Sequence, residues 1–279
     1  MIVTSSGTEH FVFDGHVHLG RARPYQTSNV GVDAYHAEDL IRDMDQAGVD
    51  MAVAFPRAEP ITDYTSGNGY VLEAARRYPT RIVPYARINP YFADRCLDQI
   101  DQYAARGVRG IKLHPFKDFG ATAVNSVDFI HPILERAGRH GLVVIIHSGG
   151  PWNATPTLIG DLALSFPSVN FILAHAGGEL EEDTMVVAKL LPTSNYYVDC
   201  AGVHNPKTIG RLVRALGADH VLFGSDRASV PYGFEISKIA RYAALDDQTV
   251  AGILGGNLLK LLGIEPDVAA YQRVDLAAI

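Results

Sequence analysis

Residues 142–150 read LVVIIHSGG, and this stretch decides the fold that we expect. It is an unbroken apolar run, rich in Val and Ile, that ends in His147 and is followed by glycine. Such a run without polar alternation is typical of a parallel strand that is buried on both faces. Because enzymes built from parallel strands carry their active sites at the carboxyl ends of those strands, His147 is the first candidate site residue.

The same pattern of a short apolar run that ends in polar residues recurs along the chain. The expected strands are Phe11–His16, Met51–Phe55, Ile82–Ile88, Val108–Leu113, Leu142–His147, Phe171–His175, Tyr196–Cys200 and Val221–Gly224. The expected helices are Ala37–Ala47, Gly69–Tyr78, Phe92–Ala105, Val127–His140, Pro156–Phe166, Glu181–Leu190, Pro206–Leu216 and Ile236–Ala244. Eight such pairs predict an α/β fold, a single (βα)8 TIM barrel that forms one domain over residues 1–279. The tail from Thr249 should add short helices over the barrel.

The composition excludes several classes of function. The formal net charge of -7 argues against nucleic acid as a partner, because binding to phosphates needs clustered Lys and Arg. Cys96 and Cys200 lie outside any CxxC pattern, so we expect packed side chains rather than a disulfide or a zinc knuckle. The chain starts without a secretory leader and has no run of the roughly 18 apolar residues that span a membrane. We therefore expect a cytoplasmic protein without a membrane partner, and a homodimer is the default oligomer.

Polar residues with metal-binding side chains end several of the expected strands. His16 and His18 alternate at the end of the first strand, so both imidazoles point to the same side. His147, His175 and Asp226 each follow an apolar run. In a barrel these strand ends converge on one mouth, which predicts four imidazoles and one carboxylate around a single cation. The alternative is that each histidine is a packed core residue, but the coincidence of five such positions favours the metal site.

Six sequence motifs resemble those of one enzyme superfamily. They are DGHVHLG, GVRGIKLHP, IIHSGG, ILAHAGG, VLFGSD and GGNLLKLLG, and they run from residue 14 to about residue 263. Together they resemble the amidohydrolase superfamily, most closely its amidohydrolase-related (amidohydrolase 2) branch, with the aminocarboxymuconate-semialdehyde decarboxylase-like metal-dependent hydrolases. The resemblance implies that His16, His18, His147 and Asp226 are metal ligands. It also implies that His175 is a catalytic group beside the metal, which polarises the substrate or transfers a proton.

The ligand types support one divalent metal and leave two reactions open. Imidazole and carboxylate suit Zn²⁺ first, with Mn²⁺ or Fe²⁺ as alternatives. A metal-bound water with a pKa of about 7 could lose its proton to Asp226 and attack a carbonyl-type bond as hydroxide, so hydrolysis is the main expectation. The alternative is a lyase that decarboxylates an unsaturated or aromatic acid without oxidation. A barrel kept only for binding is disfavoured, because unsatisfied buried polar groups carry a cost in stability.

Lys112 and His114 end the expected fourth strand and share one of its faces. In relatives with two metals, a lysine at the end of this strand is carboxylated and bridges the ions, so Lys112 is a candidate further ligand. The competing interpretation is a lysine that pairs with a carboxylate or binds an anionic substrate. His114 is a candidate for substrate contact, against a structural histidine held by the proline that follows it.

Three arginines are expected on the mouth side of the barrel. Guanidinium groups suit carboxylates, so Arg57, Arg87 and Arg227 together favour a small carboxylated substrate. Trp152, the only tryptophan, is a candidate wall of the pocket, with core packing as the alternative. Tyr25 and His204 are weaker candidates on loops.

Overall fold

The structure is a computed structural model that describes residues 1–4, 7–21, 34–57, 62–118, 120, 122–149, 152–191 and 194–279. Two residues that the sequence singled out, Tyr25 and Gly150, lie outside the described residues. Among the described residues, no helix is long and apolar enough to cross a membrane.

Eight parallel strands form a closed barrel, as predicted. The main sheet has the order β11-β10-β9-β8-β7-β6-β5-β3-β4. Its strands are β3 (Phe13–Arg21), β4 (Ala34–Tyr35), β5 (Met51–Pro56), β6 (Ile82–Arg87), β7 (Gly110–Leu113), β8 (Val143–His147), β9 (Phe171–Ala174), β10 (Tyr196–Asp199) and β11 (Val221–Leu222). The seam between the first and last barrel strands closes where the Gly15 amide donates to the Phe223 carbonyl at 2.9 Å and the His18 amide donates to the Arg227 carbonyl at 2.9 Å. The TIM barrel is therefore confirmed, with β4 as an added antiparallel strand.

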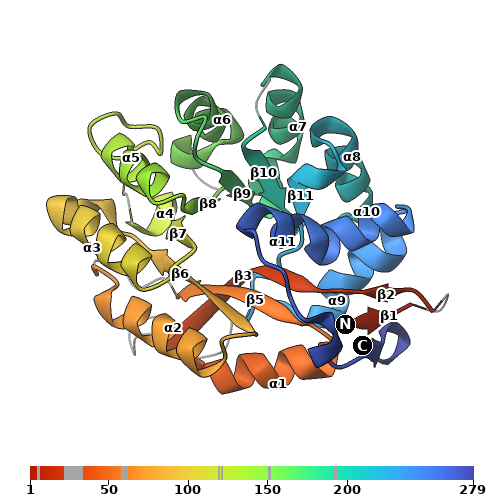
Figure 1. Ribbon diagram of the computed structural model, residues 1–279. Coiled ribbons are helices and arrows are strands. Elements are labelled where there is room, and N and C mark those ends of the chain that lie inside the picture. The colour runs from red at the N-terminus through yellow and green to blue at the C-terminus, as the bar shows by residue number, and fades with distance from the viewer. Residues whose placement is uncertain are drawn as a thin grey trace.

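Helices surround the strands on the outside of the barrel (Figure 1). They are α1 (Ala37–Ala47), α2 (Thr65–Arg77), α3 (Ala93–Ala105), α5 (His131–Arg139), α6 (Pro156–Ser165), α7 (Glu181–Leu190), α8 (Pro206–Leu216) and α9 (Tyr232–Ser237), with a short α4 (Pro115–Asp118) after β7. The predicted helices are confirmed, but some ends differ. α5 begins later than predicted because Pro132 occupies its first turn, where a missing amide hydrogen leaves no helical bond unmade.

The C-terminal tail closes the amino-terminal end of the barrel. It forms α10 (Asp247–Ala251), a π-helical turn (Gly252–Gly256) and α11 (Asn257–Leu262), and α11 lies over the ring of strands in Figure 1. Leu258 and Leu262 pack with Phe13 and other side chains of the barrel interior. Arg109, just before β7, donates a hydrogen bond to the Leu262 carbonyl at 2.5 Å. The predicted short helices over the barrel are thus confirmed, and they fill the end opposite to the strand carboxyl ends.

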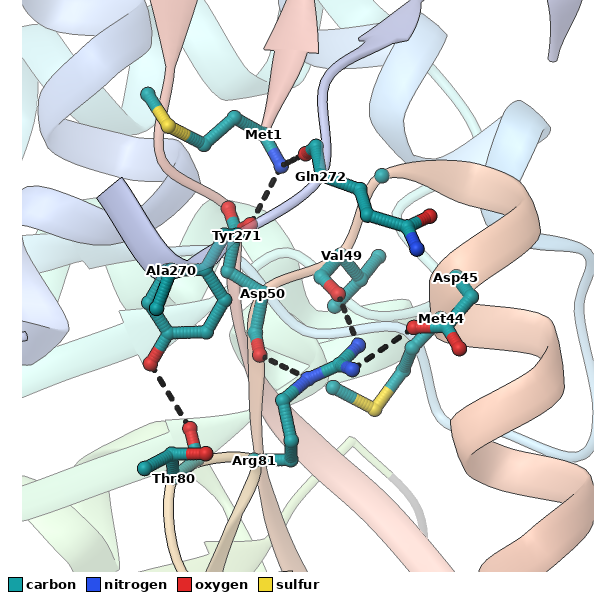
Figure 2. A pocket seen from close by; sticks show the side chains of 11 residues that line it. Met1, Met44, Asp45, Val49, Asp50, Thr80, Arg81, Ala270, Tyr271 and Gln272 are labelled. Atoms are coloured by element: carbon teal, nitrogen blue, oxygen red, sulfur yellow. Dashed lines mark hydrogen bonds and ion pairs between the residues drawn. The ribbon is translucent and has the colours of Figure 1, made fainter. Parts of the chain in front are cut away.

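A second, small sheet joins the two ends of the described chain beside the barrel. It has the order β12-β1-β2, built from β12 (Val274–Asp275), β1 (Ile2–Val3) and β2 (Glu9–His10), and the sequence did not predict it. A cavity of about 260 Å³ lies next to it (Figure 2). Arg81, just before β6, lines this cavity and bonds through Nε to the Asp50 carbonyl at 2.7 Å and through Nη2 to the Val49 carbonyl at 3.0 Å. Its Nη1 lies 2.8 Å from Asp45, so every nitrogen of this guanidinium has an acceptor.

Candidate metal centre

One carboxylate oxygen of Asp226 contacts both histidines of β3. Asp226 Oδ1 lies 3.2 Å from His18 Nε2 and 3.5 Å from His16 Nε2. On the other side of the His16 ring, Nδ1 lies 2.8 Å from Asp199 Oδ2. Because a carboxylate only accepts hydrogen bonds, the hydrogen of His16 sits on Nδ1, and the lone pair of Nε2 points to the side of Asp226 and Lys112, where it can bind a cation.

The backbone is strained at two of the predicted site residues. Asp226 has a φ of 54° and His175 a φ of 64°, in the left-handed region that residues other than glycine rarely adopt. Such conformations cost about 1–3 kcal/mol each and persist where the surroundings impose them. Here Asp14 imposes part of the geometry, because its Oδ1 accepts from the amides of Ser225 at 3.0 Å and His16 at 2.9 Å. The contacts of Asp14 thus fix the backbone next to Asp226 and at His16.

Three further histidines continue the cluster across the mouth. His175 is held by β10 and by the turn after it, since its amide donates to Asp199 Oδ1 at 2.8 Å and its Nδ1 lies 3.2 Å from the Ala201 carbonyl. Its Nε2 lies 3.1 Å from His147 Nδ1. His114 stacks on His147 with ring centroids 3.9 Å apart. His147 thus contacts the cluster through His175, whereas His16 and His18 contact Asp226.

Glycines let two loops of the mouth approach each other. A side chain at Gly149 would place its Cβ 2.2 Å from the Gly177 carbonyl oxygen and 2.3 Å from the Gly178 Cα. No residue with a side chain fits there without a shift of the backbone. This close approach of the backbone brings the ends of β8 and β9 together.

The protonation states favour cation binding. Burial lowers the pKa of His16, His114 and His147 well below the usual range, and it lowers the pKa of His18 as well. Burial alone would raise the pKa of Asp226, but the hydrogen bond with His18 and the neighbouring imidazoles hold it well below its usual value. Neutral imidazoles and an ionised carboxylate are the states in which these groups bind metal ions.

Lys112 lies beside the cluster without solvent contact. Its Nζ is 3.4 Å from His16 Nε2 and 4.9 Å from the centre of the Phe55 ring. Burial, opposed only in part by nearby carboxylates, lowers its pKa to about 7. The lysine therefore sits where the sequence placed it, next to the predicted ligands.

The donor atoms fit a divalent cation. Ligand atoms of His16, His175 and Asp226 all lie within 4.8 Å of one another, and His18 contacts the same aspartate oxygen. Nitrogen and oxygen donors of this kind suit Zn²⁺, Mn²⁺ or Fe²⁺. The three-residue group contains His175, which the sequence placed beside the metal, and not His147, which it placed on the metal. The arrangement thus supports a divalent metal site. Metal analysis of variants at His147 and His175 tests which of the two binds the metal.

The three predicted substrate arginines differ in their surroundings. Arg87 is fully buried, and its Nε donates to Asp118 Oδ2 at 3.0 Å. Arg227 is bonded at both terminal nitrogens, to Asp43 Oδ2 at 2.6 Å and to the Val230 carbonyl at 2.9 Å. Arg227 therefore has less donor capacity left for a substrate than Arg87.

The other predicted contacts lie further out. Arg57 lines a cavity of about 330 Å³ together with His36 and Tyr70. The side chain of Trp152 is 63% exposed, so the alternative of core packing is wrong for this residue. His204 is exposed on the loop after β10.

Sequence reasoning missed several residues that hold the site. Asp199 is the last residue of β10 and follows the apolar residues 196–198, so the signal that found His147 could have found it too. Asp118 and Tyr64 carry no such signal, because each comes from a connecting segment. Tyr64 donates from its hydroxyl to Asp118 Oδ1 at 2.7 Å, and both support Arg87.

A closed (βα)8 barrel with imidazoles and a carboxylate at the carboxyl ends of its strands defines the class of metal-dependent barrel enzymes. The family model described as Amidohydrolase matches residues 13–264, and the chain belongs to this family of enzymes. No curated protein matches the chain at a significant level.

Several solved structures share the fold over nearly the whole chain. The 5-carboxyvanillate decarboxylase of Novosphingobium aromaticivorans, solved with manganese and 4-hydroxy-3-methoxy-5-nitrobenzoic acid, has a TM-score of 0.76 at 15% identity, covering 94% of this chain and 98% of that one. The 2,6-dihydroxybenzoate decarboxylase of Rhizobium has a TM-score of 0.72 at 16% identity, covering 91% and 99%. A probable 2-pyrone-4,6-dicarboxylic acid hydrolase of Acinetobacter baumannii has a TM-score of 0.69 at 18% identity, covering 91% and 99%. These similarities confirm the barrel fold.

Proposed function

We propose that this protein is a metal-dependent enzyme that releases carbon dioxide from a small unsaturated or aromatic carboxylic acid. The observation that carries the proposal is a candidate proton donor, His175, within the cluster of candidate metal ligands. Decarboxylation needs those two elements: a centre that withdraws electrons and a group that protonates the carbon left behind. The similarity to two decarboxylases, one of them solved with manganese, supports the same reaction. The proposal therefore puts decarboxylation before hydrolysis, whereas the sequence alone favoured hydrolysis.

The proposed ligands are His16, His18, His147 and Asp226. A divalent cation held by them would bind oxygens of the substrate and draw electron density from the bond that breaks. Zinc stays the first choice from the ligand types, and the neighbour solved with manganese supports manganese as the alternative. Metal analysis of the purified protein distinguishes the two.

The chain's own residues would orient the centre and move the proton. Asp199 fixes the His16 ring through the 2.8 Å contact at Nδ1. His175 lies between the Ala201 carbonyl, which can only accept, and His147 Nδ1, which accepts in one tautomer. Each ring nitrogen of His175 therefore faces a possible hydrogen-bond acceptor, an arrangement that suits a group proposed to donate a proton. As the bond to the carboxyl carbon breaks, carbon dioxide leaves and the electron pair stays on the neighbouring carbon. His175 donates its proton to that carbon and is reprotonated from water.

A second candidate function is hydrolysis of a carbonyl-type bond. The similarity to the probable 2-pyrone-4,6-dicarboxylic acid hydrolase favours it. Asp226 would act as the base towards the attacking water, because its ionised carboxylate can accept a proton. The substrate-binding candidates Arg57, Arg87, His114, Trp152 and Arg227 serve either reaction.

A carbon dioxide release assay separates the two reactions. The protein, loaded with zinc or manganese, is incubated with aromatic and unsaturated acids, and in parallel with lactones and amides. We expect metal-dependent carbon dioxide release from at least one acid. Turnover of the lactones or amides alone would contradict decarboxylation and favour hydrolysis.

A further inference from the structure

Arg87, the last residue of β6, has a fully buried side chain. Among the described residues only its Nε has a hydrogen-bond acceptor, Asp118 Oδ2 at 3.0 Å. Nη1 and Nη2 are buried and have no hydrogen-bond partner among the described residues. A buried guanidinium nitrogen without an acceptor is costly, because it has lost water and gained nothing in return.

The surroundings fix the direction of this guanidinium. The Tyr64 ring lies under it, with the guanidinium carbon 4.8 Å from the ring centre. The Tyr64 hydroxyl donates to Asp118 Oδ1 at 2.7 Å, so the carboxylate that holds Nε is itself held. A guanidinium supported from behind in this way presents its two terminal nitrogens as a rigid fork, which matches the two oxygens of a carboxylate.

Two other arginines next to barrel strands do have acceptors for their terminal guanidinium nitrogens. Arg227 is bonded at both terminal nitrogens, and Arg81, at the start of β6, is bonded at all three nitrogens (Figure 2). The described residues thus supply acceptors for the terminal nitrogens of Arg227 and Arg81 and supply none for those of Arg87, although Nε of Arg227 also lacks a partner among them.

Lys112 connects Arg87 to the metal centre. The two residues are register partners on the neighbouring strands β6 and β7, and both are fully buried. Lys112 Nζ lies 3.4 Å from His16 Nε2, so the lysine stands between the arginine and the candidate ligands. His114, also on this side, has a buried Nδ1 without a partner among the described residues. A buried guanidinium, a buried amine and an imidazole nitrogen without a partner among the described residues offer donors that an anion can use.

We propose that Arg87 and Lys112 form a subsite for a second carboxylate of the substrate, which makes the natural substrate a small dicarboxylic acid. The inference rests on the proposed function, since the first carboxylate is the one lost at the metal centre. Because the terminal nitrogens of Arg87 have no solvent contact, the side chains that cover them move aside when the carboxylate binds. The carboxylate then takes the place of the missing acceptors.

Equilibrium binding tests the subsite without any need for turnover. Calorimetry on the manganese-loaded protein compares diacids with matched monoacids: isophthalate with benzoate, and glutarate with butyrate. We expect at least one diacid to bind about 10-fold to 100-fold more tightly than its monoacid, the usual range for charge-assisted hydrogen bonds. Equal affinities within both pairs in the natural protein would overturn the proposal.

Variants locate the preference on Arg87. Arg87→Gln should bring the two affinities together, while Arg81→Gln, at the other end of the same strand, should leave the diacid preference unchanged. Arg87→Lys, which keeps the charge and loses the fork, should lower the preference roughly threefold or more, and it decides the matter if Arg87→Gln does not fold. An undiminished diacid preference in Arg87→Lys, or in a folded Arg87→Gln, refutes the subsite. Absence of carbon dioxide release contradicts only the proposed function, whereas equal binding of the acids contradicts only the subsite.

Discussion

The two ends of the barrel differ in how their buried polar groups are bonded, and the arginines at the two ends of β6 show the difference. At its start, Arg81 finds an acceptor for every guanidinium nitrogen in backbone carbonyls and Asp45 (Figure 2). At its end, Arg87 keeps two buried nitrogens without acceptors among the described residues. The amino-terminal end is also filled by apolar side chains of α11, whereas the mouth carries strained backbone at His175 and Asp226.

This difference suggests that the amino-terminal end contributes mainly to stability and that the mouth carries the proposed chemistry. Close apolar packing against α11 stabilises the amino-terminal end. Buried ionisable groups and unusual backbone conformations cost free energy, and they gather at the mouth. Substitutions at the mouth should therefore change metal binding and turnover, and those at the other end should change stability.

The largest effect is expected at the mouth, from His147→Ala and Asp226→Ala. Each should abolish measurable turnover and reduce the metal content, because each removes a proposed ligand. Metal analysis and thermal unfolding of the purified variants check this, with the barrel expected to stay folded. Retained turnover in either variant would count against the ligand assignment.

His175→Asn should have the next largest effect. We expect it to keep the metal and to slow turnover by roughly 10²-fold to 10⁴-fold, the usual contribution of one acid–base group. Metal analysis combined with rate measurements checks both parts. A metal-free His175→Asn protein would show that His175 is a ligand, as its place in the group with His16 and Asp226 allows.

Leu258→Ala tests the amino-terminal end. Leu258 is fully buried in the barrel interior, so we expect a loss of about 2–5 kcal/mol in the free energy of unfolding with unchanged metal content per folded protein. The matched control is Leu164→Ala, because the Leu164 side chain is 51% exposed and should lose only about 0.5 kcal/mol. Urea unfolding measures both. Loss of metal from folded Leu258→Ala would break the division between the two ends.

The smallest expected effect concerns pH and a buried carboxyl group behind the mouth. Burial, opposed by Lys238, raises the pKa of Glu235 to about 7, so the folded state keeps this proton to higher pH than the unfolded chain. The stabilisation is complete below the ordinary pKa of about 4.5 and is lost as the pH rises through about 7. Urea unfolding from pH 5 to 8 should show a flatter pH dependence for Glu235→Gln than for the natural protein. The exposed Glu265, changed to Gln, is the control that should leave the curve as it was.

Most of the fold could be predicted because each strand is a short apolar run with its own boundary. The errors fall where tertiary contacts overrule local preference. α2 begins at Thr65 within TSGNG, a stretch that local preferences assign to a loop. β3 continues to Arg21, beyond the predicted His16, because its pairing with β5 runs on to Leu19. The strands of the small sheet have two residues each, too few for any pattern.

The candidate site was partly predictable for a geometric reason. Residues at strand ends must converge, so His16, His18 and Asp226 could be brought together from sequence alone. Partners that come from helices or connecting segments could not. The bond between Arg227 and Asp43 of α1 depends on how that helix packs, which no local pattern encodes.

The bonds of Asp14 have a consequence for the order of events during synthesis. The Asp14 carboxylate accepts from His16 on the first barrel strand and from Ser225 after the last one. These two hydrogen bonds therefore close the barrel and also position His16 and Asp226, two of the proposed ligands. The two histidines of β3 leave the ribosome early, yet they gain their aspartate only when nearly the whole polypeptide has emerged. We therefore expect a chain that is cut before Asp226 to bind a divalent cation more weakly than a chain that contains it.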